Sequence, residues 1–328
     1  MNKKPIIIVA GEPYSIFFEI FFKSLKAKEI KSIRSPIVII ASKKILIKQM
    51  KKLNFFFKIR LIDKNFLNIR SIDNHKINLI NIEFNFSKTF DKISKKSNNY
   101  ISKSFKLALN LLKKKKAKAL LNGPISKKHF LNSKFPGITE YLSSKTKCKG
   151  KEVMLIYNNN LSVSTVTTHL PLKNIFKEIT KKKIIKNIIT INEFYKKILK
   201  KTPKIAVSGL NPHCESINKN NEENKIISPA IKSVLKKRIK IFGPYPADTL
   251  FIKKNIKKFD VILGMYHDQV LTPIKTLYQF DAINITLGLP FLRVSPDHGT
   301  NNKMLGKNIS DPTSLKKSLI FLDKKSVY

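Results

Sequence analysis

The chain has 328 residues, and 42% of them are hydrophobic, a composition that excludes intrinsic disorder and is typical of a folded protein. Its apolar runs are much shorter than the about 18 residues needed to cross a bilayer, so we expect no membrane partner. Its two cysteines provide no disulfide framework and fit a reducing compartment, so we expect a cytoplasmic protein.

The formal net charge of +44 allows a protein that binds nucleic acid through its phosphates. Against that function, five of the 65 basic residues are arginine, whereas bidentate phosphate contacts and base readout favour arginine. The lysines are spread over the whole chain, together with an equally general excess of isoleucine and asparagine, as a low-GC coding bias would produce on solvated surfaces. We therefore expect no specific nucleic-acid partner, and a polycationic binder of nucleic acid stays an alternative.

Apolar runs of strand length alternate along the chain with longer amphipathic segments. Several of these runs are apolar at every position, which is typical of strands in a mainly parallel sheet with helices on both faces. The sequence therefore predicts an α/β fold. The predicted strands are residues 5–10, 35–41, 57–62, 117–122, 152–157, 161–168, 203–209, 260–266 and 282–287, and the predicted helices include residues 98–114, 182–200 and 222–237.

Five of the predicted strands end in a short polar motif, and in chain order these are "VAGEP", "LNGPISK", "VTTHLPL", "SGLNPHCE" and "GMYHDQ". Ligands bind beyond the carboxyl ends of the strands in open parallel sheets, so the motifs should face one cleft. Three of them contain a histidine, namely His169, His213 and His267. A single histidine at such a place is usually a capping or packing residue. Three imidazoles with an open position are typical of a catalytic divalent metal site, with zinc first and cobalt, manganese or magnesium as alternatives.

Two carboxylates and two isolated cations accompany the histidines. Asp248 and Asp268 are candidates for further metal ligands, for orienting the histidines or for a base, and Asp248 has the alternative of capping a helix. Lys275 is the single lysine between residues 258 and 303. It is either a cation aimed into the cleft or a surface lysine on the following helix. Arg293 is similarly isolated and suits a bidentate clamp on an anionic substrate.

Nine blocks of the sequence resemble, in order and spacing, those of the 4-hydroxythreonine-4-phosphate dehydrogenases, which are enzymes of pyridoxal 5'-phosphate biosynthesis. The blocks are "GEP", "NGPISK", "TEY", "TTHLPL", "GLNPH", "GPYPADTLF", "MYHDQ", "NITLGLPFLR" and "DHGT". The resemblance implies a three-layer α/β/α fold like that of isocitrate and isopropylmalate dehydrogenases, with two subdomains flanking an active-site cleft. Residues 1–125 plus 285–328 would form the cofactor side, and residues 126–284 the metal and dimer side.

The resemblance also implies a reaction. NAD or NADP would oxidise the secondary alcohol of 4-phosphohydroxy-L-threonine, and loss of CO2 would give 3-amino-2-oxopropyl phosphate. The enzyme would be a homodimer with its active sites at the interface. Matched by position, the metal ligands are His169, His213 and His267, some of them contributed across the dimer; the substrate contacts are Thr139, Lys275, Asn284 and Arg293; and the cofactor contacts are His298, Gly299 and Thr300.

The bound metal makes this chemistry reasonable, because Lewis acidity lowers the pKa of a hydroxyl group and stabilises the enolate left by decarboxylation. Lys275, Asp248 or Asp268 would move the protons, and the sequence leaves the choice among them open.

The chain departs from the family pattern at three places near the predicted site. Tyr14 to Phe17 replace small residues after "GEP", and Ile138 stands where the family has a substrate-contacting histidine. After His213, Cys214 and Ser216 stand where alanine and glycine are commoner in the family. The three metal-ligand histidines are intact, so we expect catalysis. The alternatives are a metal-dependent dehydrogenase of another phosphorylated hydroxy acid, of the 4-phosphothreonate or phosphoerythronate type, and a degenerate polycation that binds nucleic acid.

Overall fold

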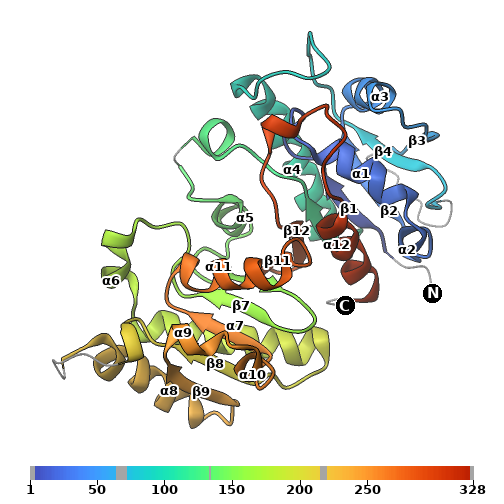
Figure 1. Cartoon of the computed structure of the whole chain (residues 1–328). Coiled ribbons are helices and arrows are strands. Elements are labelled where there is room, and N and C mark those ends of the chain that lie inside the picture. Colours follow the sequence, from blue (N-terminus) through green and yellow to red (C-terminus); the bar gives the residue numbers. More distant parts are fainter. Residues whose placement is uncertain (1–3, 64–71, 133, 215–219, 326–328) are drawn as a thin grey trace. The chain divides into compact units, whose positions relative to one another are not determined.

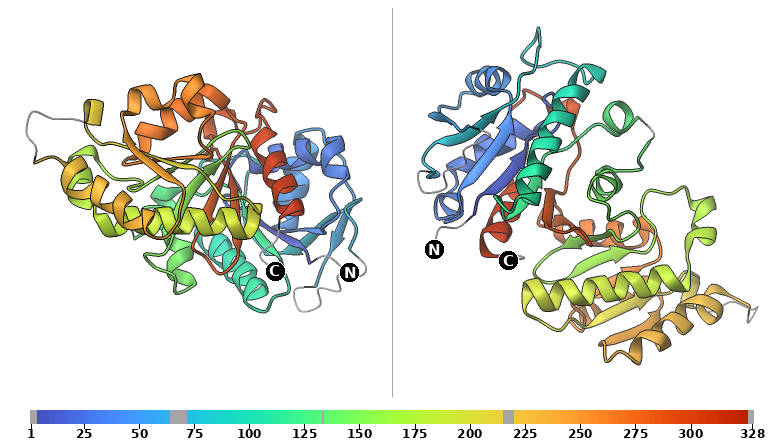
Figure 2. Two further views of the ribbon diagram at one scale, coloured as in Figure 1. Left: turned by 90° about the horizontal axis from the view of Figure 1, so that it is seen from below. Right: turned by 180° about the vertical axis from the view of Figure 1, so that it is seen from behind.

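A computed structural model describes residues 4–63, 72–132, 134–214 and 220–325 of the chain (Figure 1). The chain forms two compact units, one of Met1–Lys147 with Leu289–Tyr328 and one of Cys148–Gly288. Each unit is a sheet covered by helices on both faces (Figure 2), so the predicted α/β fold is confirmed. In the described part of the chain, no helix is both long and apolar enough to cross a membrane.

The described residues of the first unit form six strands, each parallel to its neighbours within this unit. The central strands are runs of isoleucine, valine, leucine and alanine with every residue buried, as expected for strands covered on both faces. In sheet order the strands are β3 (Ile59–Leu61), β4 (Ile77–Asn81), β2 (Ile37–Ala41), β1 (Ile6–Val9), β5 (Ala119–Asn122) and β12 (Leu292–Pro296).

The helices of the first unit lie in two layers (Figures 1 and 2). Helix α4 packs against β1, β2 and β5 on one face, and α1 and α12 lie on the other. The first turn of α5 holds the "TEY" motif, residues 139–141. The bounds are α1 (Phe17–Lys26), α2 (Lys28–Lys31), α3 (Lys43–Lys52), α4 (Asn98–Lys113), α5 (Ile138–Lys145) and α12 (Thr313–Lys324).

The segment that departs from the family pattern after "GEP" leads into the buried helix α1. Phe17 stacks on Phe21 with ring centroids 6.2 Å apart, and Phe18 stacks on Phe22 at 6.1 Å. These pairs are four residues apart, the spacing at which helical side chains meet. All four rings are buried. These four phenylalanine side chains are therefore part of the buried core of the first unit.

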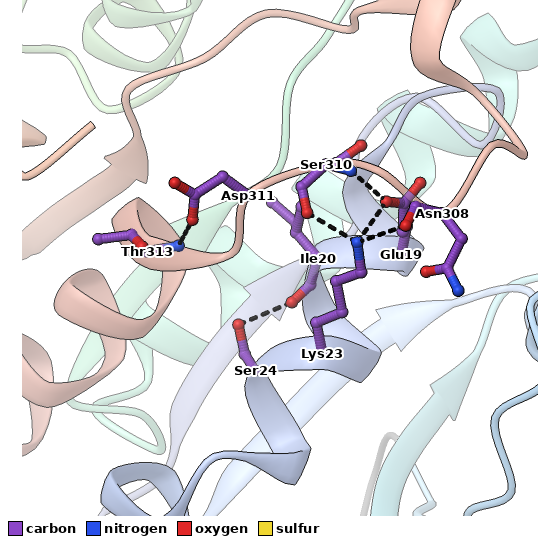
Figure 3. A network of polar contacts seen from close by, with 8 residues as sticks. All are labelled: Glu19, Ile20, Lys23, Ser24, Asn308, Ser310, Asp311 and Thr313. Atoms are coloured by element: carbon purple, nitrogen blue, oxygen red, sulfur yellow. Dashed lines mark hydrogen bonds and ion pairs between the residues drawn. The ribbon is translucent and has the colours of Figure 1, made fainter. Parts of the chain in front are cut away.

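A polar network joins α1 to the loop before α12 (Figure 3). The buried carboxylate of Glu19 accepts hydrogen bonds from the Lys23 ammonium at 2.9 Å and from the backbone N–H of Ser310. The same ammonium donates to the carbonyl oxygens of Asn308 and Ser310, both at 2.9 Å. Three oxygen acceptors thus surround the Lys23 ammonium and compensate its positive charge. They hold α1 against the loop that contains Asn308 and Ser310.

Replacing Glu19 by glutamine should lower the free energy of unfolding by about 2 kcal/mol, the scale of hydrogen bonds to a charged group. The neutral amide no longer attracts the Lys23 ammonium. Urea denaturation measures the change. Glu29→Gln is the matched control, since that acid is exposed on α2. Equal stabilities of the two variants would show that the network contributes nothing.

Outside residues 215–219, which the structure does not describe, the second unit also forms six strands, but only some of their pairings are parallel. Strand β6 runs antiparallel to both of its neighbours, β7 and β11. A loop of only four residues, 158–161, joins β6 to β7, and a loop that short permits only antiparallel pairing of these two strands. In sheet order the strands are β11 (Ile283–Leu287), β6 (Val153–Tyr157), β7 (Ser162–Thr165), β10 (Val261–Gly264), β8 (Ile205–Ser208) and β9 (Ile241–Tyr245).

The helices of the second unit again cover both faces of the sheet (Figure 2). Helices α7 and α8 lie on one face, and α11 packs on the other against β7 and β10 through Val270 and Ile274. The bounds are α6 (Ile175–Glu178), α7 (Lys181–Phe194), α8 (Ser228–Leu235), α9 (Ala247–Leu250), α10 (Lys253–Ile256) and α11 (His267–Tyr278).

Candidate active site

The three predicted metal ligands follow neighbouring parallel strands of the second unit. Strand β10 pairs with β7 on one side and with β8 on the other, all three running in one direction. His169 follows β7, His213 follows β8, and His267 is the first residue of α11 after β10. Carboxyl ends of parallel strands meet at one edge of a sheet, so the structure places all three histidine loops at that edge.

Two of the three imidazoles lie close together. The ring centroids of His169 and His267 are 5.7 Å apart. Nδ1 of His267 is hydrogen-bonded to Oδ1 of Asp268 at 2.6 Å, which leaves Nε2 of that ring for a ligand. A carboxylate that orients an imidazole in this way is typical of metal sites. The donor chemistry of this pair therefore fits a divalent ion.

His213 does not join that pair. Among residues 4–63, 72–132, 134–214 and 220–325, no group of three or more His, Cys, Asp and Glu side chains is placed to hold a metal ion. His213 is exposed, and its backbone is left-handed with φ 55°, as is that of Cys214 with φ 59°. Within one chain, therefore, two of the three predicted metal ligands, His169 and His267, lie close together.

The other predicted residues of this unit lie on α9, α11 and β11. Asp248 is exposed in the first turn of α9, where Oδ1 accepts a hydrogen bond from the Thr249 N–H at 2.8 Å. This hydrogen bond agrees with the structural alternative for Asp248, a residue that stabilises the beginning of a helix. Lys275 is half-buried in the last turn of α11. Oδ1 of Asn284, on β11, is buried and has no hydrogen-bond partner within the described structure, so it is open to a donor from a ligand.

In the first unit, Arg293 lies on β12 beside β5, and its side chain is only 1% exposed. Its Nε donates to Oδ1 of Asn122 at 2.8 Å, at the end of β5. Burial lowers the pKa of Arg293 to about 10, and the negative charge of Glu140 on α5 acts in the opposite direction. Arg293 therefore stays charged at neutral pH. Thr139, the other predicted substrate contact of this unit, precedes Glu140 and is half-buried.

The "GEP" motif supplies a buried acid that the sequence did not single out. Glu12 is 1% exposed, and Oε2 accepts a hydrogen bond from Ser97 Oγ at 2.8 Å. Its backbone N–H donates to the Pro124 carbonyl at 2.9 Å. A Cβ on Gly11, whose φ is +78°, would lie 2.4 Å from that same carbonyl. The "GEP" and "NGP" loops are therefore in direct contact, and only glycine fits between them.

Burial raises the pKa of Glu12 from 4.5 to about 7, although hydrogen bonds from Ser97 and Tyr14 act against the shift. A raised pKa means that the stability associated with the protonated acid is complete below about pH 4.5 and is lost as the pH rises through 7. Glu12→Gln should therefore be more stable than wild type at pH 8, by up to about 3 kcal/mol. At pH 4 the two should be alike, as urea denaturation would measure. A difference that does not change with pH would contradict the shift.

The predicted cofactor contacts lie in a loop of the first unit. His298 is half-buried, and its Nδ1 is hydrogen-bonded to the Gly299 carbonyl at 2.9 Å. The carbonyl of Thr300 accepts a hydrogen bond from the Ile16 N–H at 3.3 Å, directly before α1. The loop is thus joined to the beginning of that helix.

Comparison with known proteins identifies relatives over nearly the whole chain. The model of the family described as "Pyridoxal phosphate biosynthetic protein PdxA" matches residues 32–321. A 4-hydroxythreonine-4-phosphate dehydrogenase from Sulfurihydrogenibium sp. is 40% identical over 94% of each chain. A protein from Oceanobacillus iheyensis named "Putative D-threonate 4-phosphate dehydrogenase" is 34% identical over 97% of each chain.

Solved structures agree with the fold. The crystal structure of 4-hydroxythreonine-4-phosphate dehydrogenase from Klebsiella pneumoniae is 26% identical, with a TM-score of 0.83 over 98% of each chain. A beta-decarboxylating dehydrogenase from Thermococcus kodakarensis, 12% identical, shares the fold with a TM-score of 0.52 over 96% of this chain and 82% of the other. These matches confirm the predicted fold class. Because the family model and the curated relatives match almost its entire length, the chain belongs to the PdxA family of pyridoxal phosphate biosynthetic proteins.

Proposed function

We propose that the protein is a cytoplasmic, homodimeric dehydrogenase that oxidises the secondary alcohol of 4-phosphohydroxy-L-threonine with NAD or NADP. Loss of CO2 then gives 3-amino-2-oxopropyl phosphate for pyridoxal 5'-phosphate biosynthesis. The observation that carries the proposal is the pair of His169 and His267 at the carboxyl edge of the sheet, in a chain of this family. The name of the relative from Sulfurihydrogenibium sp. supports the same activity.

In this proposal His169, His213 and His267 would hold a divalent ion, zinc first and cobalt, magnesium or manganese as alternatives. Since one chain pairs two of these imidazoles, a second copy would complete the ligand set across the dimer. When bound, the ion would supply the Lewis acidity that lowers the pKa of the substrate hydroxyl and stabilises the enolate after decarboxylation.

The chain's own residues would bind and orient the substrate. Arg293 and Thr139 would contact its phosphate, since a charged guanidinium makes bidentate hydrogen bonds to such anions. The buried Oδ1 of Asn284 requires a donor, which the ammonium or hydroxyl of the substrate supplies. Lys275, Asp248 or Asp268 would move protons, and the contacts to the cofactor would come from His298, Gly299 and Thr300.

A substrate panel tests this function. Purified protein with added Co2+ is assayed for NADH or NADPH formation from 4-phosphohydroxy-L-threonine, D-threonate 4-phosphate and D-erythronate 4-phosphate. We expect turnover of the first substrate and release of CO2. Absence of turnover of 4-phosphohydroxy-L-threonine would exclude the proposed reaction. Binding of arbitrary DNA only at low salt would show the nonspecific attraction expected of a polycation.

A second candidate function is oxidation of D-threonate 4-phosphate, which has a hydroxyl where the first substrate has an amino group. The relative from Oceanobacillus iheyensis carries that substrate in its name. Ile138, half-buried at the start of α5, provides no hydrogen bond where the resemblance places a substrate-contacting histidine. Preferential turnover of D-threonate 4-phosphate in the panel would favour this second function.

A further inference from the structure

Hydrogen bonds to the backbone of Met265 join two of the histidine loops of the second unit. Thr167, two residues before His169, donates from Oγ1 to the Met265 carbonyl at 2.7 Å and from its backbone N–H at 3.1 Å. Met265, two residues before His267, donates its own N–H to Oε1 of Gln269 at 2.7 Å. Both polar groups of the Met265 backbone are therefore bonded, one of them to the loop of His169.

Gln269 extends this connection to the third loop. Its Nε2 donates to the Gly209 carbonyl at 2.8 Å, at the end of β8 and four residues before His213. On the same loop, Oε1 of Glu223 accepts from the N–H groups of Leu210 at 2.7 Å and Asn211 at 2.9 Å. The loop of His213 is therefore bonded on one side to α11 and on the other to the turn that begins at Glu223.

The backbone of these loops leaves room for the side chains that connect them. A Cβ on Gly264 would lie 3.0 Å from Oε1 of Gln269 and 2.4 Å from Val270 Cγ1. A Cβ on Gly209 would lie 3.1 Å from Oε1 of Glu223. The left-handed backbone at His213 is unfavourable for a residue with a side chain, so the loop depends on bonds from outside to keep this shape.

We propose that Thr167, Gln269 and Glu223 are positioning residues that hold the three histidine loops in one fixed register. Of these three residues, Gln269 is the central one, because its side chain bonds both to the backbone of Met265, before His267, and to that of Gly209, before His213. Side chains that lock the supports of a site reduce the cost of ordering its ligands when the ion binds. The effect on metal binding rests on the proposed function, whereas the effect on the loops does not.

The test uses the full-length protein with Gln269→Met, a variant of similar size that keeps neither hydrogen bond, and Thr167→Val. Amide hydrogen exchange is measured for residues 167–169, 209–214 and 265–268. Loss of one such bond should accelerate exchange by at least about fivefold. Affinity for Co2+, measured by competition with a chromophoric chelator, should fall by about tenfold. Thr167→Ser retains the hydroxyl and should restore both values.

Gln49→Met is the matched control. Gln49 is a buried glutamine of the first unit whose Nε2 donates to the carbonyls of Pro13 at 2.9 Å and Thr89 at 3.0 Å. It loses comparable bonds, yet it should leave exchange in the three loops and Co2+ affinity unchanged. Wild-type exchange in Gln269→Met, or an equal change in Gln49→Met, would overturn the proposal. A wild type that binds no Co2+ would overturn the proposed metal site, while exchange would still decide the role of Gln269.

Discussion

Replacing His267 by alanine should lower kcat/KM by at least about 10³-fold, because it removes an imidazole from the proposed metal site and with it the stabilisation of charge in the transition state. The variant should also lose bound divalent metal. His267 is the predicted ligand that the structure places beside His169 and orients through Asp268. Steady-state kinetics and mass-spectrometric metal analysis of the same preparation measure the two effects together.

His75→Ala is the matched control for this prediction. His75 is exposed in the first unit, in the bend directly before β4, and is distant in sequence from the three motifs, so its loss should change neither activity nor metal content. His213→Ala should behave like His267→Ala if a second copy brings His213 to the site. Full metal content in both of these site variants would contradict the three-histidine assignment.

Replacing Arg293 by methionine should lower the free energy of unfolding by about 3–5 kcal/mol, the cost of removing one partner from a buried charged arrangement. The apolar side chain leaves Oδ1 of Asn122 without its donor and Glu140 without the guanidinium that compensates its charge. Urea denaturation of the two purified proteins measures the difference.

Arg34→Met tests whether this loss depends on burial, since Arg34 is exposed in the same unit. It should be nearly as stable as wild type, because surface substitutions usually change stability by less than about 0.5 kcal/mol. A loss below about 1 kcal/mol for Arg293→Met would show that the guanidinium is not held in the interior.

Most of the sheet could be predicted from the sequence, because its buried strands are short runs of apolar residues. Three strands were missed, and each contains residues that sequence patterns assign to loops. Strand β4 carries Asn78, which is 1% exposed because its amide donates to the carbonyls of Ile37 and Asp73. Strand β9 contains a Gly–Pro pair, and β12 carries Arg293. Asn78 and Arg293 each bond to a group far away in sequence, the Ile37 carbonyl and the Asn122 side chain, so local sequence does not reveal that these two side chains are buried.

The same limit applies to the candidate site. The strand-end rule locates the three histidine motifs, since register in a parallel sheet fixes which ends meet. It does not find Glu12, Asn122 or Gln269, although each belongs to one of the quoted motifs. Glu12 bonds to Ser97 from 85 residues away, Gln269 to Gly209 from 60 and Asn122 to Arg293 from 171, and only the folded chain brings these groups together.

The order of the strands has a consequence for synthesis on the ribosome. The second unit is one continuous segment, Cys148–Gly288, whereas the first lacks β12 and α12 until the last part of the chain has emerged. Until then, the β5 edge that pairs with β12 has no strand beside it, and exposed strand edges promote aggregation. The N-terminal segment is therefore more exposed to aggregation during synthesis than after it, and a chain that stops before residue 292 cannot pair β5 with β12.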